Sequence, residues 1–132
     1  MKKIVVKPLL KVDDAEFGAD RKKARQVFGK KYKEIKKNIF AKSTMDAYDE
    51  YNVYYSKEGI FEAIEFFGEL CVYINEKKVF PGKIKALKTI LPHLELEEDG
   101  YIDRKNSVGV TVCADSPEEI ESILFGCKDY YA

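Results

Sequence analysis

Residues 47–75 alternate between two sides of an extended chain with a period of two, and this alternation restricts the fold more than any other feature. Within Tyr51–Tyr55, two tyrosines and a valine fall on one side, and an asparagine and a third tyrosine fall on the other. Residues 60–67 and 70–75 continue the pattern, and Ser56–Gly59 has the composition of a hairpin turn. The sequence therefore predicts a meander of three antiparallel strands, with Tyr51, Val53 and Tyr55 in the core.

A short helix is expected before this meander. Asp20 is a suitable N-cap, and Gly29 is a suitable residue to end the helix. The residues between them that repeat at helical spacing are Ala24, Val27 and Phe28. Lys3–Leu10 reads as an edge strand or extended lead-in whose pairing Pro8 limits. Residues 30–45 fit a helix, a strand or an irregular segment equally well.

The second half of the chain repeats this order of elements. An apolar stripe at helical spacing, residues 84–91, ends at Pro92. A turn at 98–100 is expected to open a strand that runs through Asp103, and a second strand is expected at 108–113. Residues 117–125 fit either a helix or a strand, and the parallel with the first half favours a strand. We therefore expect an α+β fold in a single domain, residues 1–132. It would consist of two tandem helix-plus-antiparallel-meander units, at about 17–75 and 79–126, with the helices packed on one face of the sheet.

Charge is sorted along the chain. Residues 1–45 hold fourteen Lys and Arg against five Asp and Glu, whereas residues 46–132 hold nine against eighteen. The formal net charge of zero thus conceals two opposite fields. No apolar run approaches the roughly 20 residues that span a bilayer. Cys71, Cys113 and Cys127 show no disulfide or redox spacing. We expect a cytoplasmic protein that is a monomer or a weak dimer and does not bind membranes.

Residues with catalytic or ligand-binding potential do not form a recognisable motif. His93 is the only histidine, and Phe80–Lys83 lacks the frame of a phosphate-binding loop. The three cysteines and one histidine are too few and too scattered for a metal site. We therefore expect no enzymatic activity, no catalytic residues, no cofactor and no metal.

Two groups of acidic residues and tyrosines suit protein recognition. Tyrosine supplies contact area at low entropic cost, and carboxylates steer a basic partner. The second group also fits a solvated strand edge, and several tyrosines also fit the core. The candidate partner-binding residues are Tyr48, Asp49, Glu50, Tyr54, Glu62 and Glu65 in the first group and Asp99, Tyr101 and Asp103 in the second.

The basic residues between 21 and 37 support an alternative function. A dense lysine and arginine segment attracts nucleic acid through counterion release. The same segment also fits a solvated helix face, which is the simpler interpretation. A third hypothesis is a small-ligand pocket lined by Tyr and Phe between the helices and the sheet.

Phe17–Lys30 resembles the capped helix of small bacterial proteins with a β-lactamase-inhibitor-protein-like or outer-membrane-assembly-lipoprotein-like fold. Asp46–Tyr51 and Glu62–Phe67 are similar to cytoplasmic members associated with toxin-immunity loci. Ala19 and Arg21 depart from the pattern, and no lipoprotein signal is present. The resemblance implies tandem helix-plus-sheet units and a soluble binding protein. The leading hypothesis is an immunity protein whose acidic, tyrosine-bearing surface occludes the active site of a basic toxin domain.

Overall fold

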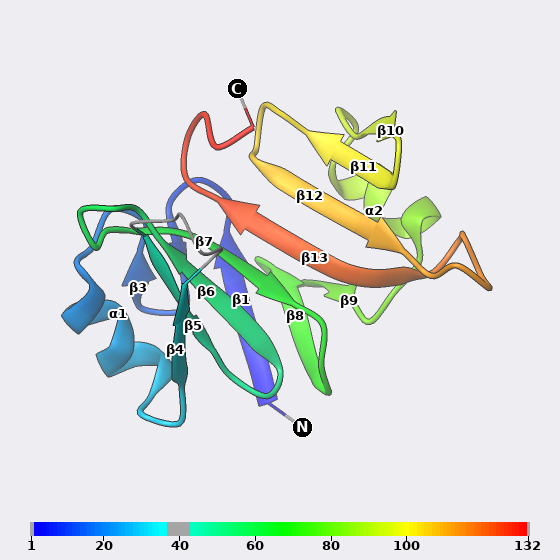
Figure 1. Ribbon diagram of the computed structural model, residues 1–132. Coiled ribbons are helices and arrows are strands. Elements are labelled where there is room, and N and C mark those ends of the chain that lie inside the picture. The colour runs from blue at the N-terminus through cyan, green and yellow to red at the C-terminus, as the bar shows by residue number, and fades with distance from the viewer. Residues whose placement is uncertain (1, 37–42, 132) are drawn as a thin grey trace.

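The computed structural model describes residues 2–36 and 43–131, and within them β-structure dominates. Two sheets contain the strands, and two short helices accompany them (Figure 1). The five-stranded sheet has the order β3 (Ala15–Glu16), β2 (Lys11–Val12), β1 (Lys2–Lys7), β8 (Leu70–Ile74), β9 (Lys77–Phe80). The eight-stranded sheet has the order β10 (Glu95–Glu97), β11 (Gly100–Asp103), β12 (Val108–Val112), β13 (Ile120–Gly126), β7 (Phe61–Phe66), β6 (Tyr51–Tyr55), β5 (Thr44–Ala47), β4 (Lys33–Lys36).

The expected α+β fold of two tandem helix-plus-meander units is therefore wrong. β6 and β7 pair as expected, but the third strand, β8, leaves their sheet and pairs in parallel with β1. Gly68 makes this change of sheet feasible because its Cα lies against the backbone of Glu50, where an added Cβ would be 2.5 Å from the Cα of Glu50. Local alternation predicts a strand but not the strand that it joins, because pairing depends on residues far away in the sequence.

The N-terminal segment is expected as an edge strand or an extended lead-in, and the structure corrects this in part. β1 lies between β2 and β8 in the five-stranded sheet, but β2 pairs only with Val6 and Lys7, whereas β8 pairs with Lys2 to Val6. The strand ends at Lys7, directly before Pro8, as the missing amide hydrogen of proline requires. Ile4 and Val6 are buried and alternate with the half-buried Val5.

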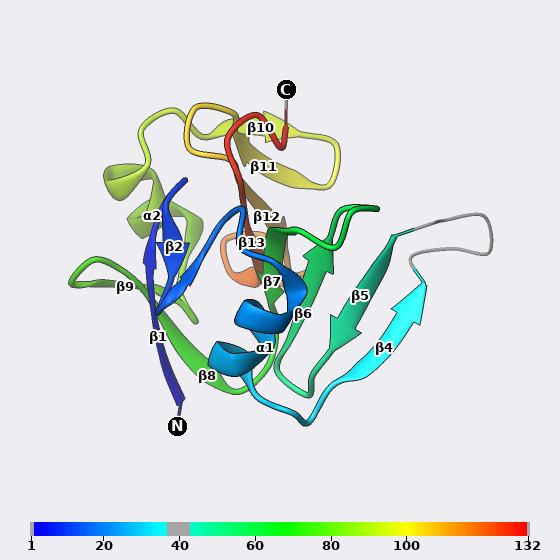
Figure 2. The ribbon, with the colours of Figure 1, turned by 90° about the vertical axis from the view of Figure 1, so that its left-hand side faces the viewer.

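Buried side chains of both sheets and both helices form one apolar core. Tyr51, Val53 and Tyr55 are at most 1% exposed, which confirms their predicted place in it. α1 (Arg21–Phe28) lies between the five-stranded sheet and the β4–β6 part of the other sheet (Figure 2). There the Phe28 ring lies 5.6 Å from that of Phe61. The helices therefore fill the margins of a core between two sheets, rather than covering one face of a single sheet.

Most of the expected local elements are confirmed. The side chain of Asp20 accepts a hydrogen bond from the Lys23 amide, and α1 ends at Gly29 with φ of 99°. α2 (Ile84–Ile90) buries Ile84 and Leu87. The ambiguous segment 117–125 contains a strand, β13, as the parallel with the first half favoured. In the open segment 30–45, residues 33–36 and 44–47 are strands, whereas residues 37–42 lie outside the described residues.

Candidate functional site

The pairing register decides which side chains of the eight-stranded sheet point away from the core. Ile64 and Phe66 of β7 are buried, so Glu65 between them lies on the opposite side, which we call the outer face. Residues that lie directly opposite one another on neighbouring strands point to the same face, so they form a row across the sheet. The row runs through Asn52, Glu65, Leu124, Gly109, Ile102 and Glu95.

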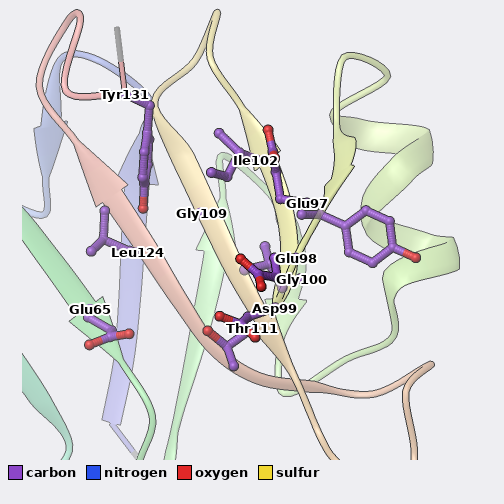
Figure 3. Close-up of a pocket in the computed structure, with 12 residues that line it drawn as sticks. Glu65, Glu97, Glu98, Asp99, Gly100, Ile102, Gly109, Thr111, Leu124 and Tyr131 are labelled. Atoms are coloured by element: carbon purple, nitrogen blue, oxygen red, sulfur yellow. The ribbon is translucent and has the colours of Figure 1, made fainter.

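An open pocket of about 280 Å³, the acidic pocket, lies on the outer face over β7, β13, β12 and β11 (Figure 3). Two segments far apart in the sequence supply its carboxylates. They are Glu65 from the first predicted group, and Glu97, Glu98 and Asp99 at the β10–β11 turn. Leu124 and Ile102 add apolar walls, and none of the described lining residues is a lysine or an arginine. The pocket therefore presents negative charge beside apolar surface, an arrangement suited to a cationic side chain with an aliphatic stem.

Hydrogen bonds hold the Glu65 carboxylate in place. The Tyr54 hydroxyl donates to one of its oxygens and the Ser122 hydroxyl donates to the other, each at 3.1 Å. Burial and the neighbouring Glu65 charge raise the pKa of Tyr54 to about 12, so the phenol remains a donor at neutral pH. Tyr54 thus orients a carboxylate as well as lying on the outer face.

The C-terminal segment forms part of the same surface. A Cβ added to Gly109 would lie 2.0 Å from the Tyr131 hydroxyl oxygen, and one added to Gly126 would lie 2.6 Å from the Cβ of Tyr130. Both glycines lie within strands, where glycine is disfavoured unless another group approaches closely. The Tyr131 side chain extends beside Leu124 at the acidic pocket (Figure 3). Gly109 within the valine-rich run 108–112 is the one sequence signal for this contact, and it was not among the predicted features.

Other candidates from the first acidic group lie away from the pocket. Asp49 is exposed and Glu50 half-buried in the turn between β5 and β6. Tyr48 packs on Tyr51, with ring centroids 4.8 Å apart, and donates a hydrogen bond to the Gly29 carbonyl at 2.9 Å. Burial is also the main cause that raises the pKa of Tyr48. Glu62 is half-buried in β7, where its carbonyl accepts a hydrogen bond from the amide of Cys127.

The second acidic group is divided in the same way. Asp99 is exposed in the β10–β11 turn and lines the acidic pocket. The Tyr101 ring contacts α2 instead, where the Lys88 ammonium lies 4.7 Å from the ring centroid. Asp103 is fully buried and accepts hydrogen bonds from the backbone and side chain of Asn106. Of the nine candidates, the structure brings Glu65, Asp99 and Tyr101 to the pocket, with Tyr54 hydrogen-bonded to Glu65.

The expected solvated helix face is only partly present, because the two arginines of α1 contact the sheet. Arg25 donates two hydrogen bonds to the fully buried Asp46, at 2.8 and 2.7 Å, and its guanidinium lies 4.0 Å from the centroid of the Tyr32 ring. Its hydrogen bond to Asp46 is the main cause that raises its pKa. Arg21 donates to the Thr44 hydroxyl at 2.8 Å. Both arginines therefore serve the attachment of α1 to β4 and β5.

The remaining basic residues of segment 21–37 are mostly at the surface. The exposed lysines are Lys22, Lys23, Lys30, Lys31, Lys33 and Lys36, and Lys37 lies outside the described residues. The alternative nucleic-acid interface therefore retains its lysines but not its arginines. Two hollows lie between a helix and the five-stranded sheet, one at α1 and one at α2, and neither has a described Tyr or Phe in its lining. Tyr55 and Phe61 lie fully buried in the core.

No group of three His, Cys, Asp or Glu side chains is placed to hold a metal ion within residues 2–36 and 43–131. None of the helices described there is both long enough and apolar enough to cross a membrane.

Comparison with known proteins gave no match, whether to a protein-family model, a curated protein or a solved structure. The resemblance to β-lactamase-inhibitor-protein-like proteins therefore remains a prediction. The function has to be argued from the site itself.

Proposed function

We propose that this chain is a non-enzymatic protein-binding protein whose outer face receives a basic protein partner. The observation that carries the proposal is the acidic pocket, where carboxylates from β7 and from the β10–β11 turn converge without a lining lysine or arginine among the described residues. Such a surface attracts a basic partner and raises the rate of encounter. Glu65, fixed by two hydrogen bonds, supplies a charge whose position is set before binding.

The partner that fits best is a bacterial toxin domain, with this chain as its immunity protein. A toxin that cleaves nucleic acid needs a basic active-site groove to hold its polyanionic substrate. A protein that presents ordered carboxylates beside apolar and tyrosine side chains imitates that substrate and covers the groove. Inhibition would occur by occlusion, with the aromatic and apolar contacts slowing dissociation.

Capture of the partner from a lysate of the native host tests this proposal. A tagged wild-type chain should retain one stoichiometric basic protein at low salt and lose it at high salt. The double variant Glu65→Gln/Asp99→Asn, which removes two pocket charges, should lose it at low salt. The matched control Glu58→Gln/Glu69→Gln removes two exposed charges outside the acidic pocket and should retain it.

The captured protein must then be toxic when produced alone and harmless when produced with the wild-type chain. Retention of the partner by the Glu65→Gln/Asp99→Asn variant would contradict the proposed surface. A captured protein without toxicity would contradict the immunity function and leave protein binding intact. Nucleic acid eluted by salt, with no protein partner, would favour the lysines of segment 21–37 instead.

A further inference from the structure

Leu96 is the most exposed large hydrophobic side chain in the described part of the chain, with 75% of its surface accessible. It belongs to β10, an edge strand, and lies between Glu95 and Glu97. Because side chains alternate along a strand, Leu96 points to the side opposite the outer face. An isolated exposed leucine needs no explanation, so its surroundings decide whether it has a role.

The surroundings of Leu96 form a second hollow, the end groove, with an open volume of about 580 Å³. It lies between the β10–β11 turn and the segment that connects β12 to β13. Val112, Ala114 and Pro117 continue the apolar lining that Leu96 begins. Glu98 and Asp99 line both this groove and the acidic pocket, so the two hollows meet at the β10–β11 turn.

The segment on the other side of the end groove also carries negative charge. The connection from β12 to β13 and the start of β13 carry four exposed carboxylates, Asp115, Glu118, Glu119 and Glu121. Burial and then the charges of these four residues raise the pKa of the Cys113 thiol next to them. Two cations lie near the groove. Arg104 pairs with Glu97 at 2.7 Å, and the Lys88 ammonium lies 4.7 Å from the centroid of the Tyr101 ring, which belongs to the lining. Glu98 and Asp99 have no ion pair with the described residues. The groove therefore combines an apolar lining with a rim on which unpaired carboxylates remain.

We infer that the end groove docks a basic amphipathic segment of the protein partner. Apolar side chains of that segment would cover Leu96, Val112 and Pro117, while its Lys or Arg side chains would face the carboxylates of the rim. The inference rests on the proposed function, because it assigns a second contact to the same partner. It also goes beyond that function, since the end groove adds the exposed Leu96 and the apolar residues Val112, Ala114 and Pro117 to the contact, so that it selects for apolar side chains of the partner as well as for charge.

Two octapeptides of equal charge separate these contributions, one alternating Lys with Ser and the other Lys with Leu. Isothermal titration calorimetry at low salt should show both binding to the wild-type chain. The Lys-Leu peptide should bind about tenfold more tightly, the amount expected when one leucine side chain is largely removed from water. The Leu96→Ser variant should bind the two peptides equally.

The matched control is Leu10→Ser, because Leu10 is 65% exposed and lies outside the end groove. Leu10→Ser should keep the preference for the Lys-Leu peptide, and circular dichroism should show that both variants are folded. A preference that survives Leu96→Ser would overturn the inference. Loss of the preference in both leucine variants would overturn it too, because the binding would then follow general hydrophobicity.

Failure of the end groove and failure of the proposed function give different results. Glu65 lines the acidic pocket and not the end groove, so Glu65→Gln separates the two hollows. Equal binding of both peptides by the wild-type chain, with weaker binding by Glu65→Gln, would remove the end groove and keep the acidic pocket. A Lys-Leu preference that depends on Leu96, with the Lys-Ser peptide bound equally by wild type and by Glu65→Gln, would keep the end groove and remove the acidic pocket. No binding of either peptide at low salt would overturn both.

Discussion

At the β4–β6 end of the eight-stranded sheet, Asp46 is fully buried between the guanidinium of Arg25 and the hydroxyl of Tyr55, whereas at the β10–β13 end Glu98 and Asp99 face solvent. Both regions contain clustered charged residues. In the first region, opposite charges pair within the molecule and attach a helix to the sheet. In the second region, the carboxylates remain available to another molecule. A charged residue in the sequence thus acquires a structural or a binding role according to what the fold places beside it.

The largest expected change in stability follows from a substitution at the buried ion pair. Asp46→Asn leaves Arg25 facing a neutral amide, and we expect the free energy of unfolding to fall by about 3 kcal/mol, the range for breaking a buried ion pair. Asp99→Asn removes an equal charge from an exposed turn and should change it by less than about 0.5 kcal/mol. Urea denaturation of both variants measures the difference. Equal effects would show that the two ends do not differ as described.

Capping and periodicity predicted the local elements, whereas the division of strands between two sheets was not predictable. Asp20 and Gly29 act through hydrogen bonds and backbone angles within a few residues, so their roles can be read locally. The pairing of β1 with β8 joins residues almost 70 positions apart, as in Lys2 and Leu70. No local pattern encodes that choice, and the expected fold class was wrong for this reason.

The candidate site was also predictable only in part. Acidic residues and tyrosines indicated the composition of a binding surface, and Glu65 and Asp99 do meet at one pocket. Asp103 has the same chemistry in the sequence but is buried under its own turn. Tyr131 approaches from the C-terminus, and only the close contact at Gly109 reveals its place.

The next largest change in stability is expected at the acidic end of the sheet, where Tyr131 packs on Gly109. Gly109→Ala introduces a methyl group where the Tyr131 hydroxyl lies, and we expect the free energy of unfolding to fall by about 1–2 kcal/mol through overpacking. The double variant Gly109→Ala/Tyr131→Ala should differ from Tyr131→Ala alone by less than about 0.5 kcal/mol, because the clash is absent. Thermal unfolding of the four proteins measures the interaction. If Gly109→Ala lowered the free energy of unfolding as much in the Tyr131→Ala background as in the wild-type chain, Tyr131 would not occupy this position.

A smaller effect concerns pH and the hydrogen bond of Tyr54 to Glu65. The pKa of Tyr54 is raised to about 12 in the folded chain, above the ordinary value of 10.0. The unfolded chain therefore loses this proton first, and the associated stability, complete below pH 10, is lost between about pH 10 and 12. Tyr54→Phe should reduce this loss by about 1 kcal/mol, since the ring is partly exposed and solvent weakens the interaction. Urea denaturation at pH 9 and pH 11.5 compares the two proteins. Identical pH dependence would contradict the raised pKa of Tyr54, which burial and the Glu65 charge cause.

The smallest effect separates the lysines of α1 from its arginines. Lys22→Gln and Lys23→Gln remove exposed charges and should each change the free energy of unfolding by less than about 0.5 kcal/mol. Arg25→Gln leaves Asp46 buried without its cation and should cost several times more. Urea denaturation again gives the ranking. If Lys22→Gln lowered the free energy of unfolding as much as Arg25→Gln, the arginines would have no special role in attaching α1 to the sheet.

The central claim is that the acidic end of the eight-stranded sheet binds cationic partners while the α1 end does not. Titration of the ¹⁵N-labelled chain with octalysine, followed by amide chemical shifts, tests it most directly. We expect shifts at Gly100, Gly109 and Leu124, which line the acidic pocket, and none at Ala24 or Phe28 of α1. Shifts centred on α1, or no shifts at low salt, would contradict it.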